Sequence, residues 1–295
     1  IRPLTHKNKI PSSHWLSPKR QMEYLLPEKY LIKLSFEREI GQTRHRDLNL
    51  QDNSEKIRLQ VFLAHCGVAS RRASEKIILD GRVSVNGQIV TEMGIKVGDD
   101  DEILVDGKKI FLENKKRYVL LNKPAGFVCS MSDEQGRPVA ADLLKEKYSE
   151  RLYNVGRLDM YSKGLIIFTN DGDFAATLSH PSAELEKEYI VETSQNIPTE
   201  FPENFKRGIR ANGVFYKCRD AQILKDRKIR IVLIEGKNRE IRNVLDSINI
   251  GTKSLTRVRI GNVSIQDMKP GEFRDLSQSE VSELLSLTTK QKEVY

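Results

Sequence analysis

Short apolar runs of strand length, set between short helical segments, constrain the fold of this chain more than any other feature of the sequence. They lie between residues 116 and 285: Tyr118–Leu121, Leu152–Val155, Gly164–Thr169, Tyr189–Glu192, Ile229–Ile234 and Val258–Val263. Strands and helices do not alternate regularly, which disfavours a parallel sheet built from repeated β-α-β units. The pattern predicts an α+β domain over residues 116–285 with a mixed, largely antiparallel sheet, followed by a tail over residues 286–295.

A second, smaller module is predicted over residues 57–110. An apolar helical period begins at Leu59 and stops at Gly67, and a second helix is expected over residues 71–79. Alternating apolar and polar residues around Asn86-Gly87 are typical of a β-hairpin, and a second hairpin is predicted around Asp106-Gly107.

Arg71 and Arg72 fall in the first turn of that second helix, directly after a potential cap, Ser70. The positive end of the helix dipole makes a cation there unfavourable by roughly 0.3–1 kcal/mol. A sequence that breaks a local preference often does so for function. Two arginines beside free backbone amides are suited to phosphate, so we predict that both contact RNA. A solvated pair without a ligand is the alternative.

The charge of the chain favours an anionic partner. Its 295 residues carry a formal net charge of +8, and between Lys225 and Arg259 ten Lys or Arg stand against four Asp or Glu. Nucleic acid is the first candidate partner. The three cysteines lack metal-ligand spacing, which indicates reduced thiols, and no apolar run is long enough to span a membrane. We therefore expect a cytoplasmic monomer that binds RNA and not membranes.

Residues 1–55 differ from the rest of the chain. Four prolines interrupt this basic segment, and three of the five histidines fall in it without the spacing of metal ligands. We expect a disordered leader. Because the chain begins with Ile1 rather than Met, it can be a fragment or a processed form, and the sequence decides neither.

The loop from Gly156 to Gly164 is the densest polar cluster between two apolar strands. Its acidic residue, Asp159, is flanked by Leu158 and Met160, so it does not belong to an acidic surface run. An Asp in such a loop is usually a turn former or a helix cap. Catalysis is the competing hypothesis.

A basic cluster precedes a predicted helix that begins near Asn238. The buried stripe of that helix is expected to consist of Ile241, Val244, Leu245 and Ile248. Arg239 and Arg242 are then neighbours on the other side, and Lys237, Asn238 and the free amides of the first turn lie beside them. This arrangement predicts an anion-binding site, with a plain solvated helix as the alternative.

Together these motifs resemble those of the RsuA/RluB-type ribosomal pseudouridine synthases. The resemblance is carried, in order along the chain, by Gly156-Arg157-Leu158-Asp159 with Gly164–Gly172, Lys187-Glu188-Tyr189, Glu235–Arg242, and Arg257–Gly261 with Lys269–Glu272. The module over residues 57–110 looks like the small RNA-binding domain named after ribosomal protein S-four. The resemblance covers about four-fifths of the chain and leaves the leader unexplained.

The resemblance implies isomerisation of a specific uridine in ribosomal RNA to pseudouridine. It implies that Asp159 acts on the ribose as nucleophile or base. An ionised carboxylate in a partly closed pocket needs a counter-charge, and we expect Arg242, or second Arg239, to supply it. Tyr189 is implied as a second catalytic residue, which stacks on the flipped base and could also assist deprotonation at its C5, and Arg157 would help to fill the vacated space. Base and sugar stay in the site, so we expect no metal and no other cofactor.

Two departures from the family pattern lie beside Arg242. Glu240 stands where the family usually has Gln, and Asn243-Val244-Leu245 replaces a more basic stretch. Either change could alter RNA affinity or the choice of target. The sequence names neither the modified uridine nor the ribosomal subunit.

Other functions remain open at this point. A non-catalytic RNA-binding or ribosome-assembly factor would show the same charge and the same small module. A glycoside hydrolase needs two carboxylates, for which Glu188 or Glu240 could join Asp159, but the dense positive charge suits RNA better than a neutral sugar. A deaminase is excluded because its zinc-ligand pattern is missing.

Overall fold

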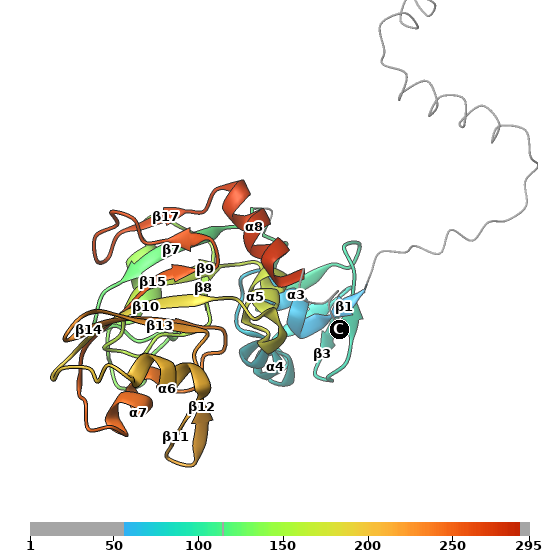
Figure 1. Ribbon diagram of the computed structural model, residues 1–295. Helices are drawn as coiled ribbons and strands as arrows, with labels where there is room; N and C mark the ends of the chain where they lie inside the picture. Colours follow the sequence, from blue (N-terminus) through green and yellow to red (C-terminus); the bar gives the residue numbers. More distant parts are fainter. Residues whose placement is uncertain (1–55, 114, 290–295) are drawn as a thin grey trace, which may run out of the picture. The chain divides into compact units, whose positions relative to one another are not determined.

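A computed structural model describes residues 56–113 and 115–289 of the protein (Figure 1). The expected disordered leader over residues 1–55, and most of the expected C-terminal tail, lie outside the described residues. The described residues belong to one compact unit, Ser54–Tyr295.

The N-terminal module, residues 57–110, contains the predicted helices and both predicted hairpins. Its elements are β1 (Ile57–Arg58), α3 (Leu59–His65), α4 (Arg71–Leu79), β2 (Val83–Val85), β3 (Gln88–Val90), β4 (Lys96–Val97), β5 (Ile103–Val105) and β6 (Lys108–Lys109). Strands β3, β2, β5 and β6 form an antiparallel sheet, with the turn residues Asn86 and Asp106 in left-handed conformation. The Ser70 hydroxyl caps α4 by accepting a hydrogen bond from the Ala73 amide at 3.2 Å.

Strands among the described residues 117–289 form a nine-stranded sheet in the order β13-β14-β10-β15-β9-β7-β17, with β16 paired to β15 and β8 to β9. The strands are β7 (Tyr118–Lys123), β8 (Tyr153–Val155), β9 (Lys163–Thr169), β10 (Lys187–Thr193), β13 (Asp220–Lys225), β14 (Lys228–Leu233), β15 (Thr252–Ile260), β16 (Val263–Ser264) and β17 (Phe273–Asp275). Every strand pair is antiparallel except β9 with β15. The predicted α+β fold with a mixed, largely antiparallel sheet is confirmed.

Both faces of this sheet are buried at β7 and β9, which explains the continuous apolar runs in these two strands. In β9, Ile166 and Phe168 face one core cluster, and Leu165 and Ile167 face the other. The first cluster is covered by η2 (Ala140–Leu144), α6 (Phe201–Arg207) and α7 (Glu240–Asp246). The second is covered by α5 (Gly172–Ser179), η3 (Pro181–Ala183) and α8 (Gln278–Thr289).

Two predicted elements are wrong in extent. The run Val258–Val263 is not one strand, because Gly261 takes a positive φ of 54° and turns the chain back from β15 into β16. The helix expected from Asn238 begins at Glu240, because Arg239 is left-handed with φ 50°. It ends at Asp246, so Ile248 lies beyond the helix and only packs partly buried against the core.

Asp171 caps α5 and ties it to the sheet. Its Oδ1 accepts hydrogen bonds from the backbone amides of Asp173 and Phe174, at 3.1 and 3.2 Å. Its Oδ2 accepts one from the Tyr118 hydroxyl at 2.7 Å and lies 2.9 Å from the Lys116 ammonium. Burial alone would raise the pKa of Asp171, but these partners outweigh it and hold the pKa below its usual value.

We expect Asp171→Ala to lower the free energy of unfolding by about 2–4 kcal/mol, because a helix cap is lost and the Tyr118 hydroxyl loses its partner. Asp173→Ala, an exposed neighbour in the same turn, is the control and should change stability by less than about 1 kcal/mol. Urea unfolding at neutral pH measures both. Because the folded pKa is lowered, the stabilisation is fully present above the unfolded pKa of about 3.9 and is lost progressively as the pH falls from there through the lower folded pKa. An equal difference between wild type and Asp171→Ala at pH 7 and pH 3 would contradict this assignment.

Candidate active site

Asp159 lies in the loop that joins β8 to β9 at one end of the sheet. The loop leaves β8 through Gly156, whose φ is 70°, and the Ser162 amide closes a turn on the Asp159 carbonyl at 3.0 Å. The Asp159 side chain is 36% exposed. Its carboxylate is therefore open to a ligand, while its backbone is fixed by turn hydrogen bonds.

A buried lysine, Lys123, holds this loop from below. Its ammonium donates hydrogen bonds to the carbonyls of Pro124, Phe127 and Met160 at 2.9, 2.9 and 3.1 Å. Burial lowers the pKa of Lys123, and the nearby Asp159 carboxylate opposes that change. Lys123 was not among the site residues predicted from the sequence. The signal available in the sequence was a lysine at the end of an apolar strand, directly before Pro-Ala-Gly.

Two arginines from the start of α7 face the Asp159 carboxylate. Oδ2 of Asp159 lies 3.6 Å from Nε of Arg242 and 3.9 Å from Nη1 of Arg239. Arg242 is only 13% exposed, and its Nη2 also donates a hydrogen bond to the Ser162 hydroxyl at 3.5 Å. Burial, and then Arg239, lower the pKa of Arg242, while Asp159 counteracts them. The expected juxtaposition of Asp159 with both arginines is present.

Arg239 has an unusual backbone for an arginine. Its φ of 50° is left-handed, a conformation that few residues other than glycine adopt. Such local strain persists where surrounding structure imposes it, and it concentrates at functional sites. Here it turns the chain so that α7 begins directly after the arginine that faces Asp159.

The carboxylate opens onto a pocket of about 410 Å³, within the range of roughly 300–1,000 Å³ typical of small-molecule sites. Its polar and charged lining includes Arg157, Asp159, Ser162, His180, Glu184, Lys187, Tyr189, Glu235, Lys237, Arg239, Glu240 and Arg257. Arg242 does not line the pocket and contacts Asp159 from behind. Asn238 also stays outside the lining, and its carbonyl accepts a hydrogen bond from Asn243 at 3.1 Å.

Tyr189 forms part of the pocket wall from β10 and is 7% exposed. In the register of the sheet it lies between Ile231 and Arg257. Its neighbour Lys187 donates hydrogen bonds to the carbonyls of Leu185 and Ile234, at 2.8 and 3.0 Å. Burial, with Arg257 adding to it, lowers the pKa of Lys187 to about 8.

Arg257 is a pocket residue that sequence reasoning placed only in a family motif. It is 4% exposed, and its Nε donates a hydrogen bond to the Leu165 carbonyl at 2.6 Å. One of its terminal nitrogens, Nη2, is buried without a hydrogen-bond partner among the described residues. Its position two residues after the apolar Leu255, on the same face of β15, was the available signal, but spacing alone does not distinguish a buried guanidinium from an exposed one.

The two departures from the family pattern have structural roles. Glu240 is buried, its Oε2 accepts a hydrogen bond from the Lys237 amide at 3.1 Å, and burial raises its pKa. A Gln at this position offers the same acceptor oxygen, so the substitution keeps the contact. Asn243 donates hydrogen bonds to the Tyr216 hydroxyl and the Asn238 carbonyl. Both side chains therefore hold the Lys237-Asn238 segment, of which Lys237 lines the pocket.

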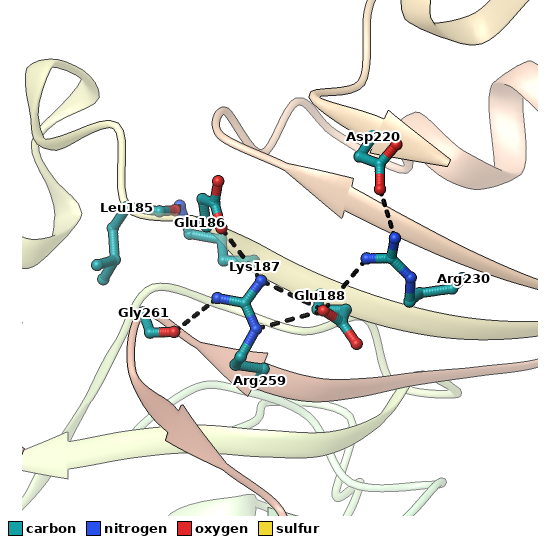
Figure 2. A network of polar contacts seen from close by, with 8 residues as sticks. All are labelled: Leu185, Glu186, Lys187, Glu188, Asp220, Arg230, Arg259 and Gly261. Atoms are coloured by element: carbon teal, nitrogen blue, oxygen red, sulfur yellow. Dashed lines mark hydrogen bonds and ion pairs between the residues drawn. The ribbon is translucent and has the colours of Figure 1, made fainter. Parts of the chain in front are cut away.

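The carboxylates considered as partners for a glycosidase mechanism lie elsewhere or are engaged. Glu188 does not line the pocket and instead joins a network with Arg259 and Arg230, which also includes Glu186 and Asp220 (Figure 2). Glu240 is committed to the Lys237 amide. Neither of the two carboxylates considered in the sequence is therefore free beside Asp159 to act as the second acid or base of a glycosidase.

The remaining predicted RNA-binding residues, Arg71 and Arg72, lie exposed in the first turn of α4, as expected. Over residues 56–113 and 115–289, no group of three or more His, Cys, Asp or Glu side chains is placed to hold a metal ion. No helix in the same part of the chain is long and apolar enough to cross a membrane.

Comparisons with known proteins agree with this geometry. The family described as "RNA pseudouridylate synthase" matches residues 117–247, and that described as "S4 domain" matches residues 57–103. An "Uncharacterized RNA pseudouridine synthase" of Borreliella burgdorferi is 40% identical over 237 residues, covering 79% of this chain and 95% of the relative. The "Ribosomal large subunit pseudouridine synthase B" of Bacillus subtilis is 36% identical over 244 residues, covering 81% of this chain and 99% of the relative. A solved structure described as "Crystal structure of pseudouridylate synthase" has a TM-score of 0.58 and 27% identity, covering 77% of this chain and 99% of its own.

The fold and the site define an enzyme that acts on RNA, with a carboxylate pocket on a largely antiparallel sheet that follows a small RNA-binding module. The chain belongs to the RNA pseudouridine synthase family, in the group whose catalytic domain follows an S4 domain. The family resemblance inferred from the motifs is confirmed.

Proposed function

We propose that this enzyme isomerises a specific uridine of large-subunit ribosomal RNA and that Asp159 is its catalytic residue. The observation that carries the proposal is the Asp159 carboxylate, open to the pocket and faced by the guanidinium groups of Arg242 and Arg239 at 3.6 and 3.9 Å. The name of the Bacillus subtilis relative supports large-subunit RNA as the substrate.

The reaction requires the target nucleotide to leave its stack, because the glycosidic bond is shielded inside a helix. In the pocket, the bond from C1′ of the ribose to N1 of uracil breaks, the base turns, and C5 bonds to C1′. The C5 proton is lost and N1 carries a proton in the product, so the reaction is an isomerisation. Asp159 acts as nucleophile at C1′ or as base on the ribose, and Arg242 and Arg239 stabilise its ionised form.

The other pocket residues have supporting roles in this proposal. Tyr189 stacks on the flipped uracil, Arg157 fills the space that the base has left, and Lys237, Asn238 and Arg239 contact phosphate or sugar. Arg71 and Arg72 bind the RNA backbone from the N-terminal module, which acts as a separate RNA-binding domain before the catalytic domain of residues 116–285. The enzyme works as a cytoplasmic monomer without a cofactor.

Tritium release tests the substrate and the reaction together. The purified protein is incubated with transcripts of large- and small-subunit ribosomal RNA that carry tritium at C5 of every uridine. We expect one tritium released per large-subunit transcript and none from the small-subunit transcript, with the modified position mapped afterwards. Binding without release from either transcript would instead favour a non-catalytic RNA-binding or ribosome-assembly factor.

A further inference from the structure

A small hairpin beside the pocket has no role in the function described so far. Strands β11 (Ile209–Ala211) and β12 (Val214–Tyr216) pair only with each other and project next to α6 and α7 (Figure 1). The turn between them is Asn212-Gly213, with φ values of 50° and 77°, as type I′ hairpin turns require.

The two faces of this hairpin differ. On the inner face, Ala211 and Tyr216 are buried. Arg210 and Phe215 are directly opposite each other in the register and share the outer face, where both are exposed. Phe215 is 45% exposed, although an apolar ring of that size is normally buried in the core of a folded protein.

The Phe215 ring is seated on the backbone of Gly208. A Cβ atom at Gly208 would come within 2.0 Å of Cζ of Phe215, so the ring occupies the space that any side chain would need. Gly208 has a φ of 117°, which also favours glycine. The ring is thus held against a flat surface with much of its area left open, which is the form of an aromatic stacking platform.

The segment that carries the ring is positively charged. Between Arg207 and Arg219 the sequence has four Lys or Arg and no Asp or Glu. Arg207, Arg210 and Lys217 are exposed and have no ion-pair partner among the residues that the structure describes. An exposed aromatic ring among unpaired cations is complementary to unpaired nucleotides, which offer a base to stack and a phosphate to neutralise.

The hairpin is continuous with the rim of the pocket. Lys237, which lines the pocket, donates a hydrogen bond from its ammonium to the Phe215 carbonyl at 3.1 Å. The Tyr216 hydroxyl accepts a hydrogen bond at 2.9 Å from Asn243 of α7, the helix that supplies Arg242. RNA that delivers a nucleotide to Asp159 therefore has a short path across this surface.

We propose that the β11–β12 hairpin is a second RNA-binding site, in which Phe215 stacks on an unpaired base near the target uridine and Arg210 contacts a phosphate. The inference rests on the proposed function for the choice of RNA. It adds a contact outside the catalytic pocket through which the enzyme recognises nucleotides that flank the modified uridine.

The first test compares variants of Phe215 with a control of equal exposure. Base stacking on an aromatic side chain is worth about 1–3 kcal/mol, so Phe215→Ala should weaken binding of the large-subunit transcript about 5- to 150-fold. Phe215→Leu keeps an apolar cover over Gly208 and should show a similar loss with unchanged thermal unfolding. Phe215→Tyr keeps an aromatic ring and should bind the transcript as tightly as wild type. Leu224→Ala, on β13, removes a side chain that is 44% exposed and should bind as wild type.

A spectroscopic test detects the stack directly. In Phe215→Trp, addition of the transcript should quench the added indole fluorescence. Leu224→Trp is the matched control, whose fluorescence should change no more than that of wild type with its single Trp15. Arg210→Gln should also reduce the slope of log affinity against log salt by about one.

The outcomes separate this inference from the proposed function. If wild type releases tritium but Phe215→Leu binds and modifies free RNA as well as wild type does, the hairpin is not an RNA site. If Phe215→Leu loses binding and modification only with ribosomal particles, and not with free RNA, the surface contacts a ribosomal protein and the inference is overturned. If wild type releases no tritium, the proposed function fails, while the fluorescence measurement still decides the stacking.

Discussion

Replacing Asp159 with asparagine is expected to reduce tritium release from the large-subunit transcript by about 10⁴-fold or more. Asparagine has nearly the same shape but carries no charge, so it can act neither as nucleophile nor as base on the ribose. Loss of a residue in direct contact with the reacting atoms typically has effects of this size. A single-turnover assay with excess enzyme measures the chemical step without interference from slow product release.

Binding should respond in the opposite direction to catalysis. Asp159 places a negative charge beside two arginines at a surface that receives phosphate, so Asp159→Asn should bind the transcript at least as tightly as wild type. Asp226→Asn is the control, because Asp226 is exposed in the turn between β13 and β14 and forms no ion pair among the described residues. Wild-type turnover in Asp159→Asn, with its identity verified by mass, would remove Asp159 from the mechanism.

The strands of the catalytic domain could be predicted because their apolar runs are buried on both faces. The side chains of residues 164–169 point alternately to the two faces of the sheet, and apolar residues occupy both faces. Such a run is typical of a strand that is covered on both sides. The predicted extents of one strand and one helix were wrong because a single positive φ, at Gly261 and at Arg239, sets where each element ends or begins. A positive φ at an arginine has no signature in sequence, so the start of α7 was placed about two residues early.

The charged residues inside the protein could not be predicted from spacing. Lys123 binds the carbonyl of Met160, 37 positions later, and Arg257 binds that of Leu165, 92 positions earlier. Whether a lysine or an arginine is buried depends on such distant partners, which supply the hydrogen bonds that make burial tolerable. The approach of Arg242 to Asp159 also joins residues far apart in the sequence. It was expected only after the family resemblance had singled out Asp159 as a carboxylate that needs a counter-charge.

Gly164 shows how closely the site depends on the sheet beneath it. It is the second residue of β9, the strand that leaves the Asp159 loop, and it pairs with Arg257 in the parallel contact between β9 and β15. A Cβ atom at Gly164 would lie 2.1 Å from the Arg257 carbonyl oxygen, and φ is 102°. The two strands can therefore approach each other only when residue 164 has no side chain.

Gly164→Ala is expected to lower the free energy of unfolding by about 2–5 kcal/mol, because the methyl group adds a backbone clash to an unfavourable φ. Gly271→Ala is a matched control, since Gly271 has a similar φ of 87° but no atom within 4 Å of the position that an added methyl group would take, and it should cost only about 1 kcal/mol. Urea unfolding measures both.

The folded fraction of Gly164→Ala should also lose activity, because separation of β9 from β15 moves the Asp159 loop away from Tyr189 and Arg257. Equal stability of the two variants would show that the strands can separate without cost, and the close approach at Gly164 would then not be what holds the catalytic loop in place.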